Sequence, residues 1–494
     1  MQTGATAVLK ARRLTPAGLF AGGGPYHRRP PAAAEAMSDR VHAIILAAGQ
    51  GTRMKSARPK VLHAVGGKPM LGHVLDAATE AGIGQAHLVL GHGAEQVRAW
   101  LETRPGPAPQ AVIQAQQLGT AHAVGQALPA VPDTALVVVL YGDVPLISAA
   151  TVQALIEAAQ DGLALLTVTL DEPRGYGRIL RDAAGRVTGI VEEKDASDAQ
   201  RQILEVNTGL IAAPARRLRR WLAHVGNDNA NREYYLTDVV GLAARDGVAI
   251  RTLQAASAAE VEGVNDPLQL ARAERLYQRR QAERLQRDGL YLADPARFDL
   301  RGQLHIGRDV QIDIGCVIEG TVTLGDNVRI GPYCILRDVE VAAGTRIEAH
   351  SLLDDCRVGP GCVIGPYARL RPGTELGRDV HIGNFVELKK TTVGDGSKAN
   401  HLAYLGDAVI GARVNVGAGV ITCNYDGAHK FTTTIGDDAF IGTDSQLVAP
   451  VRIGRGAYIA AGSTIAKDAP DDQLTINRAR DQRSLPGWKR PRKA

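Results

Sequence analysis

The residues best suited to chemistry in the first part of the chain are a Gly-rich segment, LAAGQGTRM at 46–54, and the pair Pro59-Lys60. Glycines allow successive backbone N–H groups to face an anion, and Arg53 and Lys60 add mobile positive charge suited to a triphosphate. The segment lacks the GK[ST] of a Walker A loop and the GxGxxG of a dinucleotide-binding turn. The pattern therefore indicates a phosphate site of another type.

A second candidate is Asp143, which lies in the sequence YGDVP at 141–145 directly after an apolar run. A carboxylate at the end of a buried strand, beside a phosphate-binding loop, is suited to Mg²⁺, a cation that prefers oxygen ligands. An Asp that follows a Gly is also a common turn residue. The metal interpretation therefore depends on its surroundings.

The elements that must position these residues alternate between apolar runs and helical stretches. Strands are predicted at 41–47, 86–90, 135–141, 163–170 and 187–191, and a helix is predicted to begin near Met70. Continuous apolar runs separated by helices are typical of a parallel sheet that is covered on both faces. In such sheets ligands bind at the carboxyl ends of the strands.

The C-terminal half has a different period, because aliphatic residues recur at every sixth position. The three runs are Ile306, Ile312, Ile318, Leu324, Ile330 and Leu336; Val358, Ile364, Leu370, Leu376, Ile382 and Leu388; and Ile435, Ile441, Leu447, Ile453, Ile459 and Ile465. A period of six fits neither an α-helix nor an ordinary strand. It predicts a three-sided parallel β-helix from about Leu304 to about residue 469, with each aliphatic side chain inside the prism.

Two further segments follow from this organisation. Asp266-Pro267 reads as a helix N-cap with Pro at the first helical position, so 268–287 is predicted to be an amphipathic helix that connects two domains. The six-residue period slips at Lys389-Lys390 and again at 423–427. Insertions in a solenoid must bulge outward, so functional loops are expected there.

Composition excludes some classes of protein. The formal net charge of +5 comes from the two ends, since residues 1–36 and the last eight residues each carry +4 and leave −3 for the rest. A nucleic-acid surface is therefore not predicted, and no apolar run is long enough to span a bilayer. Residues 1–36 read as a disordered extension or a mis-called start before Met37, although their Arg-rich, acid-poor composition also fits a transit peptide.

The cysteines are odd in number and form no CxxC pair: Cys316, Cys334, Cys356, Cys362 and Cys423. Neither a disulfide framework nor a zinc site is predicted, and a reducing, cytoplasmic setting is expected.

The motifs together resemble those of sugar-1-phosphate nucleotidylyltransferases. They are LAAGQGTRM, PKVLH, QQLGT, YGDVPL, GYGRI, VEEKDA, NTGL and VEGVND, in that order. With the β-helix, residues 37–494 resemble the bifunctional N-acetylglucosamine-1-phosphate uridylyltransferase/glucosamine-1-phosphate acetyltransferase family. The resemblance implies a Rossmann-like α/β domain with a mostly parallel sheet (37–266), a linker helix (267–288) and a left-handed parallel β-helix with a C-terminal tail (289–494).

The resemblance also implies the roles of single residues in the first domain. The set expected to bind the nucleotide and sugar is Leu46, Ala47, Ala48, Gly49, Lys60, Gln114, Gly119, Thr120, Tyr141, Gly142, Asp143, Gly177, Glu192, Asn207 and Asn265. Within it, Asp143 and Asn265 would bind Mg²⁺. Arg53 and Lys60 would be catalytic, neutralising charge while the sugar phosphate attacks UTP. From the residues alone, Glu192 also reads as a surface charge and 207–209 as a turn.

In the β-helix, the resemblance implies that His401 is the general base of acetyl transfer. Histidine ordinarily has a pKa of about 6.5, which suits removal of a proton from a sugar ammonium. The expected sugar-phosphate ligands are Arg371, Lys389, Tyr404 and Asn415, and those of acetyl-CoA are Ala418, Asn424, Tyr425, Thr443, Ala461 and Arg478. A homotrimer is implied as well.

The implied function is a two-step synthesis of UDP-N-acetylglucosamine for cell-wall and lipopolysaccharide precursors, from glucosamine 1-phosphate, acetyl-CoA and UTP. Two alternatives remain. One is a nucleotidylyltransferase whose β-helix only assembles or regulates the protein, which His401, Asn424 and Tyr425 together disfavour. The other is a non-catalytic assembly protein, which the intact Arg53, Lys60 and Asp143 disfavour.

Overall fold

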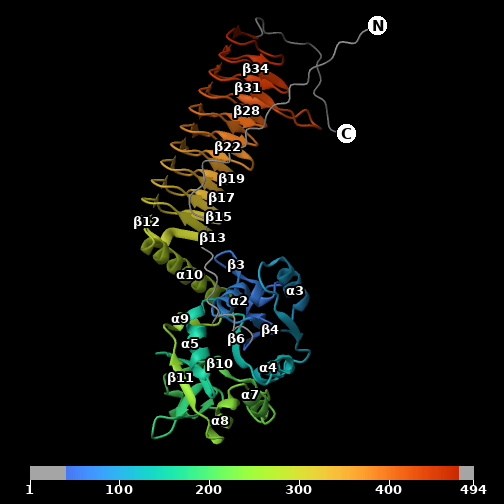
Figure 1. The fold of residues 1–494 in the computed structure, drawn as a ribbon, viewed down its shortest axis with the longest axis vertical. Coiled ribbons are helices and arrows are strands. Elements are labelled where there is room, and N and C mark those ends of the chain that lie inside the picture. Colours follow the sequence, from blue (N-terminus) through green and yellow to red (C-terminus); the bar gives the residue numbers. More distant parts are fainter. Residues whose placement is uncertain (1–39, 478–494) are drawn as a thin grey trace, which may run out of the picture.

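The structure is a computed structural model that describes residues 40–477. The N-terminal extension at 1–36, the C-terminal tail and Arg478 lie outside the described residues. An α/β part and a long prism of stacked coils are joined by one helix, α10 (Pro267–Arg287) (Figure 1). Within the described part of the chain, no helix has both the length and the apolarity needed to cross a membrane.

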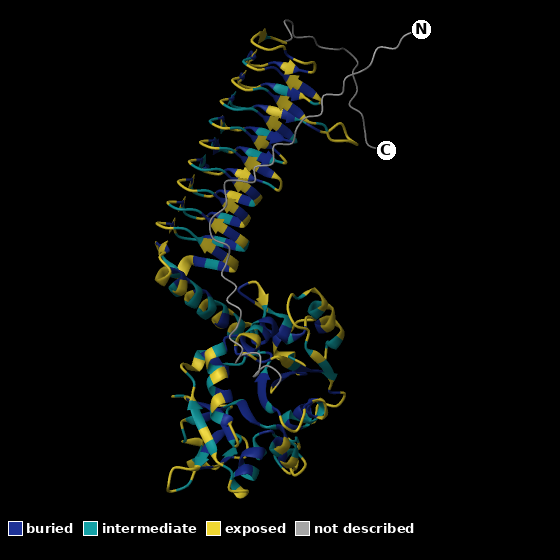
Figure 2. Cartoon of the chain, viewed as in Figure 1, coloured by how far each residue is buried: buried dark blue, intermediate teal, exposed yellow. Residues whose placement is uncertain are grey.

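The α/β part is built on one sheet with the strand order β11-β7-β10-β6-β1-β4-β5. Its strands are β1 (Val41–Ala47), β4 (Gln85–Leu90), β5 (Gln110–Ile113), β6 (Leu136–Tyr141), β7 (Leu163–Thr169), β8 (Arg178–Arg181), β9 (Val187–Val191), β10 (Glu205–Pro214) and β11 (Ile250–Gln254). All seven residues of β1 are buried, as the apolar run predicts. The dark interior of this sheet is visible in Figure 2.

The sheet is mostly parallel, as expected, with one antiparallel strand in its interior. β1 pairs in parallel with β4 and β6, but β10 runs antiparallel between β6 and β7. The strand predicted at 187–191 exists as β9, yet it pairs only with β8, antiparallel, at the margin of the sheet. The segment 207–209 is neither a simple turn nor a regular strand, because the register of β10 shifts between Asn207 and Ile211.

Helices cover both faces of this sheet. They are α2 (Met70–Glu80), α3 (Ala94–Thr103), α4 (Thr120–Ala127), α5 (Ala149–Ala159), α6 (Asp198–Arg201), α7 (Ala215–Leu222), α8 (Asp238–Arg245) and α9 (Ala258–Val261), with 3₁₀ turns η1 (Thr52–Met54), η2 (Lys60–Leu62) and η3 (Leu128–Ala130). Leu71 of α2 and Leu155 of α5 pack in the core on one face, and Val124 of α4 and Leu218 of α7 in the core on the other. A short hairpin, β2 (Ala64–Val65) and β3 (Lys68–Pro69), precedes α2.

The linker helix matches its prediction closely. The side chain of Asp266 accepts a hydrogen bond from Gln269 N at 2.8 Å, and Pro267 occupies the first helical position. Ala273 is buried in a small core, with Leu270 and Tyr277 packed against it.

The prism is the expected parallel β-helix, in which strands of successive coils pair in register. One face contains β12 (Tyr291–Leu292), β14 (Gln311–Ile312), β16 (Arg329–Ile330), β18 (Arg346–Ile347), β20 (Val363–Ile364), β23 (His381–Asn384), β26 (Lys398–His401), β29 (Asn415–Val416), β32 (Phe440–Ile441), β35 (Tyr458–Ile459) and β37 (Leu474–Thr475). Ile312, Ile330, Ile347, Ile364 and Ile382 form one column of paired positions on this face. All five are buried in the prism core.

The remaining strands form the other faces of the prism. They are β13 (Phe298–Ile306), β15 (Cys316–Leu324), β17 (Ile335–Val341), β19 (Leu352–Val358), β21 (Arg369–Leu370), β22 (Thr374–Leu376), β24 (Glu387–Lys389), β25 (Thr392–Val393), β27 (Tyr404–Gly406), β28 (Ala408–Ile410), β30 (Ile421–Cys423), β31 (Thr433–Ile435), β33 (Gln446–Val448), β34 (Val451–Ile453) and β36 (Thr464–Ile465); η4 (Pro295–Arg297) precedes them. The prism begins earlier than the predicted Leu304, because β12 and β13 already pair with the next coil.

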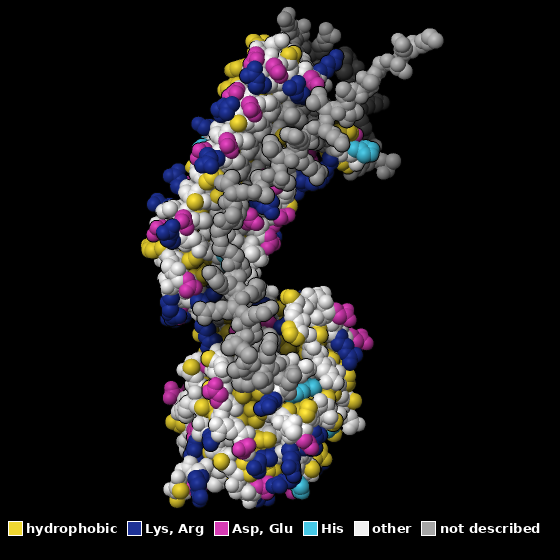
Figure 3. Space-filling model, in the orientation of Figure 1, with side chains coloured by type: hydrophobic (Ala, Val, Ile, Leu, Met, Phe, Trp, Pro, Cys, Tyr) yellow, Lys and Arg dark blue, Asp and Glu magenta, His cyan; other side chains and the backbone are white. Residues whose placement is uncertain are grey.

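The outer surface of the prism is charged and its interior is not. Acidic and basic side chains lie beside one another along the visible face (Figure 3). All five cysteines are free, and four of them are buried in the prism. Cys316 Sγ donates to Gly331 O at 3.2 Å and Cys362 Sγ to Gly377 O at 3.1 Å, and burial raises the pKa of both thiols to about 11.

Candidate active sites

The first site is a cleft of about 340 Å³ at the carboxyl ends of β1 and β6. Most of the residues expected to bind the nucleotide line it: Leu46, Ala47, Ala48, Gly49, Lys60, Gln114, Gly119, Thr120, Tyr141 and Asp143. Val61, Gln117, Ala123 and Glu233 line it as well and were not predicted. Gln117 has a clear role, since its Nε2 donates to Ala48 O at 2.5 Å and fixes the glycine-rich turn.

Gln114 and Gly119 form one edge of this cleft. Gln114 is buried, and its Nε2 donates to Gly119 O at 3.2 Å. Gly119 has φ of 112°, and a Cβ there would lie 2.5 Å from Tyr234 O, so the chain can turn into α4 at this point only with glycine. The edge offers amide and backbone groups, which is the chemistry that a polar nucleobase edge requires.

Lys60, Asp143 and Asn265 meet at the base of the cleft although they are far apart in sequence. The Lys60 ammonium donates to the Asp143 carboxylate and, at 3.0 Å, to Asn265 Oδ1. Lys60 and Asp143 side chains are 13% and 16% exposed, so water screens this pair weakly. The oxygens of Asp143 and Asn265 both bind the Lys60 ammonium, and such a pair of oxygen ligands is also suited to a hard divalent ion.

A protein-only metal cage is absent from residues 40–477, because no group of three or more His, Cys, Asp or Glu side chains there could hold a metal ion. Mg²⁺ commonly takes one or two protein ligands and completes its shell with water and substrate phosphates. Asp143 and Asn265 therefore fit a Mg²⁺ that is shared with a nucleotide.

A second cavity of about 340 Å³ adjoins the cleft, and Thr120, Tyr141 and Glu233 line both. It contains the predicted sugar ligands Glu192 and Asn207. Asn207 Oδ1 is buried without a hydrogen-bond partner, so it offers an acceptor to a ligand.

Electrostatics of this cavity follow from burial. Burial raises the pKa of Glu192, although the Thr237 hydroxyl donates to its carboxylate at 3.0 Å. Burial also raises the pKa of Tyr141, so its phenol stays protonated. Gly177 lies beside the cavity, where its carbonyl accepts from Asn207 N at 2.9 Å, and a Cβ there would lie 3.3 Å from Glu192 Oε2.

Four predicted residues of the first domain are not among those that line the cleft or the cavity: Gly177 and Asn265, described above, and Arg53 and Gly142. Arg53 is exposed on η1 and is not among the residues lining the cleft. Gly142 serves the backbone, since its N–H donates to Leu46 O at 2.9 Å and a Cβ would lie 3.2 Å from Val61 Cγ1.

The second site lies on the prism around His401, at the end of β26. His401 is exposed, and its Nδ1 lies 3.2 Å from Asn384 Oδ1 on the preceding coil. An amide oxygen can only accept, so this contact places the proton on Nδ1 and leaves Nε2 free to accept one. Asn384 was not predicted, although its register opposite His401 follows from the coil length.

Tyr404, three residues after His401, and Asn424 approach one another around Gly406. A Cβ on Gly406 would overlap the Tyr404 hydroxyl and lie 2.9 Å from Asn424 Nδ2. Asn424 is nearly buried, and its Nδ2 donates to Asp407 Oδ2 at 2.5 Å. Tyr425 is 60% exposed on the loop that follows.

That loop is the predicted outward bulge. Paired residues of adjacent coils are 17 positions apart between β26 and β29, but 25 apart between β29 and β32. The added residues bring Lys430 toward Lys389, and Lys430 is the main cause of the lowered pKa of Lys389. Arg371 adds to this effect and donates to Glu387 Oε1 at 2.8 Å. Lys389, Lys430 and Arg371 are thus close enough to repel one another, and such a group of cations is suited to a phosphate. Lys430 was not predicted.

Three of the six predicted acetyl-CoA residues stack at one corner of successive coils. Asp444 N donates to Ala418 O at 2.7 Å, and Gly462 N donates to Thr443 O at 2.8 Å, so Ala418, Thr443 and Ala461 follow one another along the prism. Thr443 and Ala461 are exposed, and Asn415 is half-buried on β29. Within residues 40–477 of a single chain, this corner and His401 are therefore open to solvent.

Comparisons with known proteins match both parts of the chain. Residues 43–237 match the MobA-like NTP transferase domain, 300–393 the GMPPB C-terminal domain, and 432–467 the bacterial transferase hexapeptide (six repeats). The bifunctional protein GlmU of Aromatoleum aromaticum is 59% identical over 91% of this chain and 98% of its own length. Those of Alkalilimnicola ehrlichii and Marinobacter nauticus are 57% and 53% identical, over 92% of this chain and 97% and 99% of their own lengths.

Proposed function

This chain belongs to the family of bifunctional GlmU proteins and is both an acetyltransferase and a uridylyltransferase, and we propose how its two sites divide these activities. Uridylyl transfer belongs to residues 37–266 and acetyl transfer to 289–494. The substrates are glucosamine 1-phosphate, acetyl-CoA and UTP. The single observation that carries this division is that Lys60 joins Asp143 and Asn265 at the cleft of the α/β part, whereas Lys389 and Lys430 lie together on the prism.

In uridylyl transfer, the phosphate of N-acetylglucosamine 1-phosphate attacks the α-phosphorus of UTP and pyrophosphate leaves. Positioning and charge neutralisation carry such a reaction. The cleft beside β1 takes the nucleotide, and the adjoining cavity with Glu192 and Asn207 takes the sugar. Lys60 neutralises charge at their junction. Mg²⁺, held by Asp143 and Asn265, supplies further charge neutralisation when bound.

In acetyl transfer, His401 Nε2 removes a proton from the ammonium of glucosamine 1-phosphate. The free amine attacks the thioester carbonyl and the carbon–sulfur bond breaks. The nitrogen loses one further proton as the amide forms, and the departing sulfur takes a proton to leave as the thiol of CoA. The tautomer set by Asn384 supports this role, because Nε2 is then the basic nitrogen. Arg371, Lys389 and Lys430 bind the phosphate, and Asn424 and Tyr425 line the acetyl end of the site. Arg478 remains a proposed acetyl-CoA ligand.

The exposed setting of His401 also supports a homotrimer, in which a neighbouring prism would close the acetyl-CoA groove. A cytoplasmic location is part of this proposal, because all five cysteines are free thiols, which suits a reducing compartment. Mass measured by light scattering coupled to size-exclusion chromatography tests the trimer, and a monomer with full acetyltransferase activity would exclude it.

The division of labour predicts opposite effects of two substitutions. His401→Ala should abolish acetyl transfer and leave uridylyl transfer nearly intact, while Asp143→Ala should do the reverse. Thiol release from acetyl-CoA and pyrophosphate release from UTP measure the two reactions. His350→Ala, an exposed histidine on an earlier coil, is the matched control. If either active-site variant stays folded but loses both activities, the proposed division is wrong.

A further inference from the structure

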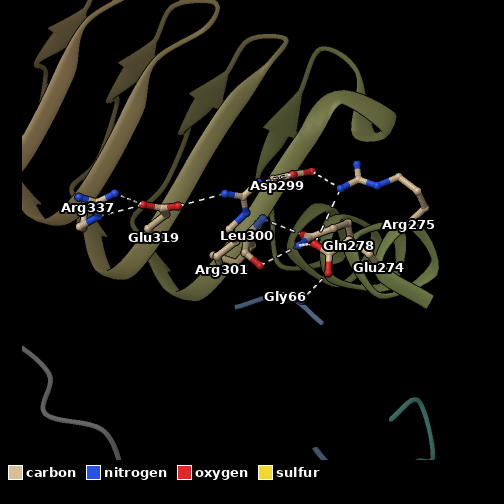
Figure 4. A network of polar contacts seen from close by, with 9 residues as sticks. All are labelled: Gly66, Glu274, Arg275, Gln278, Asp299, Leu300, Arg301, Glu319 and Arg337. Carbon is tan, nitrogen blue, oxygen red and sulfur yellow. Dashed lines mark hydrogen bonds and ion pairs between the residues drawn. The ribbon is translucent and has the colours of Figure 1, made fainter. Parts of the chain in front are cut away.

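The linker helix α10 touches three segments that carry the residues of the uridylyl site. Figure 4 shows α10 beside both the Gly66 turn and the first coils of the prism. Its buried residue Ala273 packs in a small core with Val65, Leu146 and Val264. Each of these three belongs to a segment that bears Lys60, Asp143 or Asn265.

The Lys60 segment is held through the hairpin β2–β3, which follows η2 directly. Gly66 N donates to Glu274 Oε2 of α10 at 2.6 Å. Gly66 has φ of 56°, and a Cβ there would overlap the Tyr277 ring, so the turn lies flat against the helix. Tyr277 is also in edge contact with His73, with ring centroids 5.0 Å apart.

The other two segments are held by separate contacts. Arg280 Nη1 donates to Leu146 O at 2.7 Å, three residues after Asp143. Asn265 N donates to Gln269 Oε1 at 2.8 Å, in the first turn of α10. The three side chains that meet in the cleft therefore share one external support.

The same helix is fixed to the prism on its other side. Gln278 is buried, donates to Leu300 O at 3.0 Å and accepts from Leu300 N at 2.7 Å. It also donates to Glu274 Oε1 at 2.9 Å, which joins the contact with Gly66 to the contact with the prism (Figure 4). Arg275 adds an ion pair to Asp299 at 2.8 Å.

We propose that Glu274 and Arg280 are positioning residues of the uridylyl site, which set the places of Lys60 and Asp143 from the prism side. This inference rests on the proposed function of that cleft. Neither residue touches substrate, so both act through the backbone segments they hold. Small displacements of groups that stabilise a transition state lower kcat more than substrate affinity.

The test is the double substitution Glu274→Ala/Arg280→Ala in the full chain. We expect uridylyl kcat to fall about tenfold and the Mg²⁺ concentration for half-maximal rate to rise, with the KM for UTP changed less than about threefold. Acetyltransferase activity should stay within about twofold of the unsubstituted protein. In the Arg280→Ala background, Glu274→Gln keeps an oxygen acceptor for Gly66 N and should restore most of the Glu274-dependent loss.

The matched control is Arg279→Ala/Glu283→Ala, which removes an exposed pair of the same charges from the same helix. It should change neither activity. Unchanged uridylyl kcat in the Glu274/Arg280 variant overturns the inference, and so does an equal loss of both activities, which indicates general destabilisation. Lys60→Ala separates the two proposals, because full uridylyl activity in that variant refutes the proposed function of the cleft itself.

Discussion

Removing the Lys60 ammonium should isolate the contribution of one positive charge to uridylyl transfer. Lys60→Met keeps the length of the side chain and its contact with Gly51, where a Cβ would lie 2.8 Å from Lys60 Cβ. It removes the donor to Asp143 and Asn265. The backbone of η2 should be unaffected.

The size of the effect follows from burial. Because the Lys60 side chain is only 13% exposed, an effective dielectric constant of about 20 applies, and two unit charges about 4 Å apart then interact by about 4 kcal/mol. Each 1.36 kcal/mol lost from a transition state is about a tenfold change in rate. Since water and Mg²⁺ replace part of the lost charge, kcat should fall about a hundredfold to a thousandfold.

The assay measures pyrophosphate release at saturating UTP and N-acetylglucosamine 1-phosphate, with acetyl transfer by the same preparation as an internal control. Arg98→Met, an exposed cation on α3, is the matched control for loss of charge in the same domain. A fall of less than about fivefold, with acetyl transfer intact, would refute the electrostatic role of Lys60.

Two further predictions concern the sugar-phosphate pockets. Lys430→Ala should raise the KM for glucosamine 1-phosphate about tenfold or more with little change in kcat, because a charge-assisted contact to phosphate is lost; Lys467→Ala, exposed elsewhere on the prism, should not. Burial raises the pKa of Glu192 above its value in the unfolded chain. Protonated Glu192 therefore stabilises the fold, fully so below the unfolded-state pKa, and this stabilisation is lost as pH rises through the folded-state pKa. Glu192→Gln should therefore resist urea better at pH 8 but bind N-acetylglucosamine 1-phosphate about tenfold more weakly, and equal or lower urea resistance there would contradict this.

The prism could be predicted almost entirely from the sequence because each coil repeats the same local constraint. With a period of six, every sixth side chain points into the interior of the prism, so the aliphatic residues at that spacing must be the buried ones. Ile364 and Ile382 are buried as that period predicts. The same reasoning located the bulge at 423–427. The period gave no sign that Lys430 belongs to the site, because its ammonium comes near Lys389 only once the loop has folded.

The α/β part was less predictable for a related reason. Apolar runs mark buried strands but carry no direction. The strand β10 was not predicted at all, and neither was its antiparallel course. The resemblance to a known family supplied Asp143 and Asn265, whereas their shared contact with Lys60 depends on long-range packing. The support from α10 involves Glu274 and Arg280, two charges that read as solvated on the helix surface.

The free thiols differ in burial, and this difference can be used for selective labelling. Cys334 and Cys356 are buried and have pKa values raised to about 12, so a maleimide at neutral pH finds almost no thiolate there. Cys423 is the one cysteine that is not fully buried, and it directly precedes Asn424 and Tyr425. Burial raises the pKa of Cys423 as well, but this thiol is partly accessible. A single fluorophore or spin probe attached to the unaltered protein would therefore lie beside two residues that we propose line the acetyl end of the site, without engineering any other position.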